Sequence, residues 1–206
     1  MSIEMRKLSV GPWPMNCYIL ICRDTNKSAV VDPGDDHEKI LTAANHTEVT
    51  KILLTHGHPD HIGALEEIKS ATSAPVLIHP LDAALFNIYY DIPISNGDVI
   101  QIGNIKITAI HTPGHTPGQT SFDLGDNRII VGDTLFPGGP GKTWSPEEFR
   151  LTMKTLENVV FKWPDETEFY PGHGNSGKIG IERSAFTEFI KRGWHKDTFG
   201  DVVWSN

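Results

Sequence analysis

The chain has 206 residues and a formal net charge of −8, and 38% of its residues are hydrophobic. This length suits one domain with its own core, and the apolar content excludes an intrinsically disordered chain. An acidic chain without a basic run argues against nucleic acid as a partner. The N-terminal stretch MSIEMRKLSV has no long apolar run. We therefore expect no signal peptide, no membrane partner and a cytoplasmic location.

The first half of the chain predicts strands that alternate with helices, because apolar runs indicate strands and apolar residues at helical spacing indicate helices. In chain order we expect strands at 4–10, 17–22 and 28–32, a helix at 35–45, a strand at 51–54, a helix at 61–69, a strand at 74–79 and a helix at 81–88.

The second half adds four strands, a long helix, a short strand and a last helix. They are expected at 98–102, 105–110, 119–124 and 128–132, from Ser145 onward, near 168–170, and at 180–192. Ser145 followed by proline is typical of a helix start. Two runs of strands with helices beside each predict an α/β fold of two sheets packed face to face, with helices outside. We expect one domain over 1–206, with a short C-terminal helix and tail from about 180.

Four polar clusters each follow a predicted strand. They read THGHPDH after 51–54, HTPGHTPG after 105–110, VGDTLF after 128–132 and YPGHG after 168–170. Strand ends at one edge of a sandwich are a natural place for a site. The candidate residues are His56, His58, Asp60, His61, His115, Asp133 and His173.

Imidazole and carboxylate groups together suit zinc, and also iron or manganese. Seven groups are too many for one tetrahedral ion and suit two ions that share a carboxylate. His56 and His58 are two residues apart in an extended segment, so they should face the same way. His61 begins a helix, where the chain turns toward a second ion. We therefore expect two divalent metal ions, with zinc as the first choice.

The stretch HTPGHTPG offers two histidines. His111 closes an apolar strand, where a hydrogen bond would account for it. His115 lies between two turns and is free to project, so we choose His115 as the ligand. His79 also ends a strand, and we assign it a structural role.

These motifs resemble those of the metallo-β-lactamase-fold hydrolases, and the closest branch is glyoxalase II, the hydroxyacylglutathione hydrolases. The resemblance covers about residues 16–175 and rests on THGHPDH, HTPGHTPG, GDTLF and YPGHG. It implies a four-layer αβ/βα sandwich of two mixed sheets. It also implies two metal sites, one formed by His56, His58, His115 and Asp133, and the other by Asp60, His61, His173 and the shared Asp133.

The resemblance further implies a substrate-binding role for Lys142. Family members that act on glutathione thioesters use a lysine in a GCGK loop to bind the glycine carboxylate of glutathione, and here the loop reads GPGK. The family's tyrosine after Gly-His is missing from GHGNSG. Residues 174–206 leave room for about one helix and a tail, not for the helical domain of glyoxalase II. The chain therefore resembles the short, single-domain members. Trp13, in a Pro-rich loop, is a second substrate-binding candidate.

We expect a dinuclear hydrolase in which a hydroxide bridging the ions attacks a small-molecule thioester, ester or lactone. A single zinc already lowers the pKa of water from about 16 to about 7. Asp60 and Asp133 are the catalytic candidates, and Asp60 would orient the hydroxide. The alternatives are a mononuclear iron persulfide dioxygenase and a β-lactamase or lactonase of the same superfamily. A homodimer is compatible with this prediction.

Overall fold

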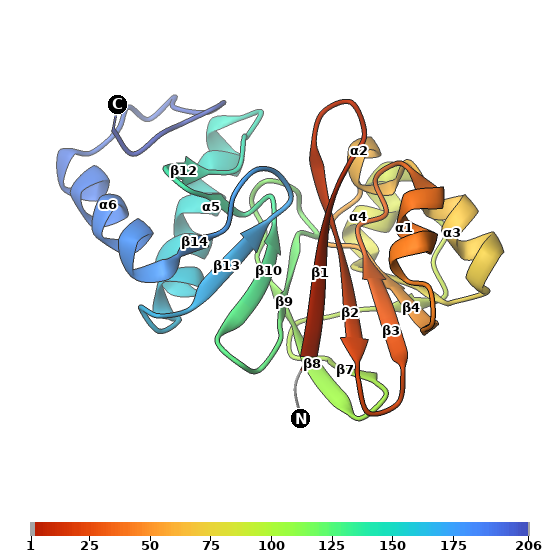
Figure 1. Cartoon of the computed structure of the whole chain (residues 1–206). Helices are drawn as coiled ribbons and strands as arrows, with labels where there is room; N and C mark the ends of the chain where they lie inside the picture. The colour runs from red at the N-terminus through yellow and green to blue at the C-terminus, as the bar shows by residue number, and fades with distance from the viewer. Residues whose placement is uncertain (1–2, 206) are drawn as a thin grey trace.

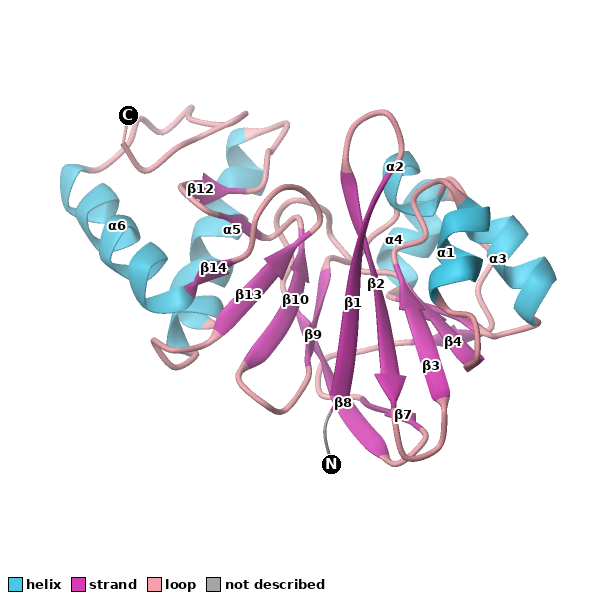
Figure 2. Cartoon of the chain, in the orientation of Figure 1, coloured by secondary structure: helices cyan, strands magenta, loops and turns pink. Residues whose placement is uncertain are grey.

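The computed structural model describes residues 3–205, which form two six-stranded sheets that pack face to face (Figure 1). Helices lie on both outer sides of the sheets, so the molecule has four layers (Figure 2). The predicted α/β sandwich is confirmed. None of the described helices is long and apolar enough to cross a membrane.

The first sheet has the strand order β1-β2-β3-β4-β5-β6. Its strands are β1 Ile3–Val10, β2 Met15–Cys22, β3 Lys27–Val31, β4 Glu48–Leu53, β5 Val76–Ile78 and β6 Ile92–Pro93. The first three strands pair antiparallel and β3 to β6 pair parallel, so the sheet is mixed. Its helices are α1 His37–Ala43, α2 Pro59–Ile62, α3 Leu65–Thr72 and α4 Pro80–Phe86.

The second sheet has the order β14-β13-β10-β9-β8-β7 and is also mixed, because only β10 and β13 pair parallel. Its strands are β7 Val99–Ile102, β8 Ile105–His111, β9 Thr120–Asp123, β10 Arg128–Gly132, β13 Glu168–Pro171 and β14 Gly177–Lys178. A small ribbon of β11 Leu135–Phe136 and β12 Gly139–Pro140 follows β10. The helices on this side are α5 Pro146–Asn158, the 3-10 helix η1 Val160–Lys162 and α6 Ile179–Arg192.

Apolar side chains fill the three spaces between these layers. Between the sheets, Leu20 and Phe122 belong to one buried cluster. Ile52 and Ile68 belong to the cluster between the first sheet and its helices, and Phe169 belongs to the one beneath α5 and α6. Burying a side chain of this kind stabilises the fold by roughly 1.5–3 kcal/mol. The sheets therefore form a rigid frame for the loops at their edge.

The single helix predicted at 61–69 was wrong, because α2 ends at Ile62 and α3 begins at Leu65. The backbone of the loop after β3 causes the break. Ala64 N–H donates to the carbonyl of Pro33 (2.9 Å), and a side chain at Gly63 would collide with the carbonyl of Gly34. The helix after Ser145 is confirmed, and the Ser145 side chain caps it by accepting from Glu148 N–H (3.2 Å). Five short elements were not predicted from the sequence, because each is only two or three residues long: β6, β11, β12, β14 and η1.

The two sheets are joined where β13 ends. Tyr18 Oη and Asn16 Nδ2, both from β2, donate to the carbonyl of Pro171 at 2.6 and 2.9 Å. The Thr120 N–H likewise donates to the carbonyl of Thr55 across the sheets (2.8 Å). Since β8, β10 and β13 run in the same direction, their C-terminal ends lie at one edge of the second sheet. This edge meets the end of β4.

Candidate metal centre

The structure brings all seven candidate side chains into one cluster at this shared edge. Three groups have ligand atoms that lie within 4.8 Å of one another. These groups are His56–His58–His115, His56–His61–Asp133 and Asp60–His61–His173. The groups overlap, so the cluster is continuous.

The first half of the cluster is made of three imidazoles. The rings of His56 and His58 have centroids 4.8 Å apart, and both lie within 5 Å of the His115 ring. The two-residue spacing therefore does direct both side chains to one place. Burial lowers the pKa of His56 well below its usual value and that of His58 to about 4. Both rings are thus neutral at physiological pH, which is the state that binds a metal.

The second half combines one carboxylate with two imidazoles. His173 Nε2 lies 3.1 Å from Asp60 Oδ2, and the rings of His61 and His173 are 5.5 Å apart. The side chains of Asp60 and His173 are partly exposed, whereas His61 is fully buried. This half therefore lies nearer the solvent.

Asp133 lies between the two halves. Its Oδ1 is 3.4 Å from His61 Nε2, and its Oδ2 is 3.6 Å from His115 Nε2 and 3.9 Å from His173 Nε2. Burial alone would raise the pKa of Asp133, but the surrounding imidazoles hold it well below its usual range. The carboxylate therefore faces both groups as an anion.

Three buried polar atoms of the cluster have no hydrogen-bond partner within residues 3–205. They are His56 Nε2, His61 Nε2 and Asp133 Oδ1. An unsatisfied buried polar atom costs about 1–3 kcal/mol, and a metal ion bound among these three atoms would satisfy them. All three are atoms of the type that bind zinc and iron. The residues present therefore fit a metal centre.

Hydrogen bonds behind the cluster orient the rings. Asp32 is 1% exposed and accepts from Thr55 N–H (2.7 Å) and Thr55 Oγ1 (2.6 Å). Its Oδ2 also lies 3.0 Å from His61 Nδ1. The Thr55 hydroxyl in turn lies 3.0 Å from His56 Nδ1, from which it can accept. Each ring thus donates outward through Nδ1 and presents Nε2 to the centre, the arrangement typical of metal-binding histidines.

Two further histidines also turn Nδ1 away from the centre, in their case toward a backbone carbonyl. His115 Nδ1 lies 2.8 Å from the carbonyl of Lys142, and His173 Nδ1 lies 3.1 Å from that of Pro14. Asp32 was not predicted from the sequence, although VVDPG places it at a strand end like the other clusters. Its place at the end of a predicted strand could have identified Asp32 as a site residue.

His61 carries an extra proton in this arrangement. Burial alone would lower its pKa, but the carboxylates of Asp133 and Asp32 raise it to about 10. A metal bound at Nε2 must therefore displace a proton.

Aromatic side chains border the centre. Trp144 is 49% exposed, and its ring lies 5.1 Å from the His58 ring and 5.2 Å from the His115 ring. The Phe86 ring is 5.1 Å from the His58 ring. Trp13, the predicted substrate residue, is 78% exposed in the loop between β1 and β2. That loop also supplies the carbonyl that faces His173.

Lys142, the other predicted substrate residue, is engaged by the C-terminal tail. Its Nζ lies 3.3 Å from Asp201 Oδ2. Thr143 and Gly200 exchange backbone hydrogen bonds beside this pair (3.0 and 3.3 Å). The tail thus lies against the GPGK loop next to His115.

His111 and His79 are not members of the three ligand groups. Their rings stack face to face at 4.4 Å. His111 Nε2 lies 2.8 Å from the carbonyl of Pro117, and His79 caps α4 by accepting from Leu81 N–H. These contacts account for both histidines as structural groups.

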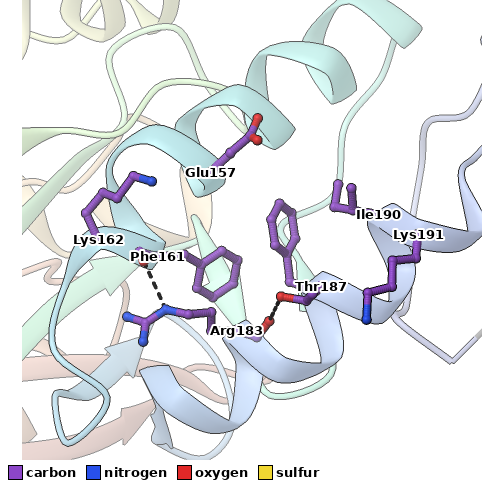
Figure 3. A pocket seen from close by; sticks show the side chains of 8 residues that line it. Glu157, Phe161, Lys162, Arg183, Thr187, Ile190 and Lys191 are labelled. Atoms are coloured by element: carbon purple, nitrogen blue, oxygen red, sulfur yellow. Dashed lines mark hydrogen bonds between the residues drawn. The ribbon is translucent and has the colours of Figure 1, made fainter.

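A separate hollow lies between α5 and α6 (Figure 3). It is lined by Phe161, Lys162, Arg183 and Thr187, among others. Arg183 already donates to the carbonyl of Phe161 (2.9 Å), and Thr187 donates to that of Arg183 (2.8 Å). No candidate ligand lines this hollow, so it is separate from the metal centre.

The fold and this cluster define a class of metal-dependent hydrolase domains. Residues 10–173 match the Metallo-beta-lactamase superfamily. The chain belongs to this superfamily, whose members bind divalent metals. The predicted resemblance is confirmed.

Two relatives and one solved structure place the chain within the superfamily. It is 32% identical over 204 residues to the "Probable metallo-hydrolase YqgX" of Bacillus subtilis, covering 88% of this chain and 95% of the relative. It is 26% identical over 208 residues to the "Hydroxyacylglutathione hydrolase GloC" of Haemophilus influenzae, covering 89% and 95%. The crystal structure of "TTHA1623 in a di-iron-bound form" superposes with a TM-score of 0.72 at 27% identity, covering 86% and 96%.

Proposed function

We propose that this chain is a dinuclear metal-dependent hydrolase of small thioesters, esters or lactones. The observation that carries the proposal is the position of Asp133, whose two oxygens face His61 on one side and His115 and His173 on the other. One ion would be held by His56, His58, His115 and Asp133, and a second by Asp60, His61, His173 and Asp133. Zinc is the first choice, and the di-iron form of a structural neighbour makes iron the second.

Two bound divalent ions would supply the central chemistry, because such ions lower the pKa of a coordinated water and polarise a carbonyl oxygen. The chain's own residues would do the rest. The partly exposed carboxylate of Asp60 can accept a hydrogen bond from the attacking water and orient it. The buried anion of Asp133 offsets the positive charge of the centre and fixes its two halves relative to each other.

We further propose a substrate with an apolar part next to the centre and without a glutathione-type carboxylate. Trp144 and Phe86 border the His58 side of the centre and offer an apolar surface. Lys142, which would bind a carboxylate in a glutathione-type substrate, is paired with Asp201. An exposed pair of this kind is worth only about 0.2–1 kcal/mol. Lys142 alone therefore does not make a strong site for glutathione.

Metal analysis combined with a substrate panel tests this function. We expect close to two metal ions per chain after loading with Zn²⁺, and hydrolysis of a small aryl thioester that is lost with a chelator and restored by Zn²⁺. A phenyl ester, a lactone and nitrocefin complete the panel. Asp133→Ala should lose both ions and at least 100-fold in kcat/KM, more than a lost outer contact would cost. A wild-type protein with one ion, or an active Asp133→Ala with full metal, would contradict the proposal.

A further inference from the structure

Asp82 is a fully buried carboxylate in the first turn of α4 (0% exposed). It accepts three hydrogen bonds, all from outside its own helix. Its Oδ2 accepts from Thr116 Oγ1 (2.7 Å) and Gly57 N–H (3.1 Å), and its Oδ1 accepts from Gly118 N–H (2.5 Å). Asp82 was not among the residues predicted from the sequence.

The three donors belong to the two loops that carry the first half of the metal centre. Gly57 lies between His56 and His58 in the loop after β4. Thr116 follows His115 directly in the loop after β8. One carboxylate therefore ties a loop of the first sheet to a loop of the second.

The ligands on these loops meet at short range. His58 Nδ1 and His115 Nε2 are 3.0 Å apart, although the residues are 57 positions apart in the chain. The backbone of Gly118 packs directly against Asp82, so a side chain at Gly118 would collide with Asp82. This carboxylate therefore bridges the two loops next to the point where their ligands meet.

The bonding pattern requires an acceptor at both oxygens. Two backbone N–H groups point at different oxygens of the same side chain, and a backbone N–H can only donate. An ionised carboxylate accepts from both, whereas an amide has only one acceptor atom. Burial raises the pKa of Asp82, and the three donors oppose this rise by stabilising the anion.

We propose that Asp82 is a positioning residue for the half of the metal centre formed by His56, His58 and His115. This inference rests on the dinuclear centre proposed above. Asp82 hydrogen-bonds to Gly57, Thr116 and Gly118 and to none of these three ligands, so it acts through the two loops. In the other half, His61 Nδ1 lies against Asp32 and His173 Nδ1 against the Pro14 carbonyl, and neither contact involves Asp82. Asp32 also reaches His56 through the Thr55 hydroxyl, so it supports both halves, whereas Asp82 contacts only the loops of the first.

Asp82→Asn gives the sharpest test, because it keeps the shape of the side chain. In either orientation of the amide, its NH₂ group faces the N–H of Gly57 or of Gly118. One loop is therefore repelled while the other stays bound. Thr116→Val is a milder companion that removes one donor and keeps both backbone bonds.

The readout is the affinity of metal-free protein for each of two Zn²⁺ ions, measured by competition with a chelator. We expect Asp82→Asn to lower the affinity for one Zn²⁺ ion by about 10–100-fold, since outer contacts of metal ligands have effects of this size. The affinity for the other ion should stay within threefold of the wild-type value. Thr116→Val should lower the affinity for the same ion by a smaller factor. Asp91→Asn is the matched control, because Asp91 also accepts a backbone N–H, from Val76 (2.8 Å), but lies outside the centre.

Two results would overturn the proposal. One is an Asp82→Asn protein that binds both ions with unchanged affinity. The other is an equal loss at both ions with a lower unfolding temperature of the metal-free protein, which would mean a general structural role. Should Asp82→Asn not fold, an unchanged Thr116→Val would count against the proposal. Failure of the proposed function is seen separately, in the wild type: fewer than two bound ions would remove the half-site that Asp82 is said to position.

Discussion

Asp32 Oδ2 lies 3.0 Å from His61 Nδ1, while His61 Nε2 lies 3.4 Å from Asp133. The imidazole of His61 is therefore held between two carboxylates, one behind it and one at the metal centre. The carboxylate behind the ring fixes which nitrogen faces the centre and makes that nitrogen a better donor to a metal.

Replacing Asp32 with Asn should weaken the binding of the metal ion that His61 would hold. The amide has one acceptor oxygen in place of two, so it cannot accept both from Thr55 N–H at Oδ1 and from the Thr55 hydroxyl and His61 Nδ1 at Oδ2. The His61 ring also loses a neighbouring negative charge. We expect a loss of about 10–100-fold in Zn²⁺ affinity, measured by chelator competition. Asp24→Asn, in an exposed turn, is the control and should bind Zn²⁺ like the wild type. Unchanged affinity in Asp32→Asn would show that Asp32 does not support the ligand.

Metal binding should release at least one proton near pH 7.5. His61 has a pKa of about 10 in the metal-free protein and is protonated at this pH, whereas His58, with a pKa of about 4, is not. A metal needs the neutral ring, so Zn²⁺ affinity should rise with pH up to about 10. Calorimetry in buffers of different ionisation enthalpy measures the number of protons. A heat of binding that does not depend on the buffer would refute this prediction.

The same raised pKa predicts how the stability of the metal-free protein depends on pH. The unfolded chain has a His pKa of about 6.5. Since the folded value is higher, the contribution of His61 is fully present below about pH 6.5 and is lost as the pH rises through about 10. Urea unfolding at pH 6.5 and at pH 9 should show the loss, and it should be smaller in His61→Ala. Equal loss in both proteins would assign the effect to other groups.

His115, not His111, should be required for metal. His115 Nε2 lies 3.6 Å from Asp133, whereas His111 is occupied by the Pro117 carbonyl and by stacking on His79. We expect His115→Ala to lose at least one ion by elemental analysis and His111→Ala to keep both. The opposite result would reverse the assignment.

Asp201→Asn should make the protein slightly better at using a substrate with a carboxylate, because it frees Lys142. A pair worth about 0.2–1 kcal/mol limits the gain in kcat/KM to about fivefold. The measurement compares S-lactoylglutathione with a small uncharged thioester, with Lys142→Ala as the control. A wild-type preference of a thousandfold for the glutathione compound, lost in Lys142→Ala, would instead mean a dedicated glutathione site.

The sequence alone was sufficient to predict the layered architecture and the seven members of the cluster. Both depend on local patterns. Apolar runs and helical spacing report burial residue by residue, and the string THGHPDH places four polar groups within six positions. The strand ends are also local features. Asp32 was within reach of the same reasoning, because it follows β3 as the other clusters follow their strands.

Only the tertiary structure decided how these groups are divided and supported. Asp82 looks like an ordinary acidic residue in a first helical turn, and its role appears only when Gly57 and Gly118, 25 and 36 residues away, donate to it. The break in the helix at Gly63 likewise comes from the Pro33–Gly34 backbone, and the engagement of Lys142 comes from Asp201 in the tail. Sequence periodicity indicates whether a side chain is buried or exposed, and the residue type indicates which polar partners it requires. The packing of the chain determines which distant residue provides that partner, and no short stretch of sequence contains this information.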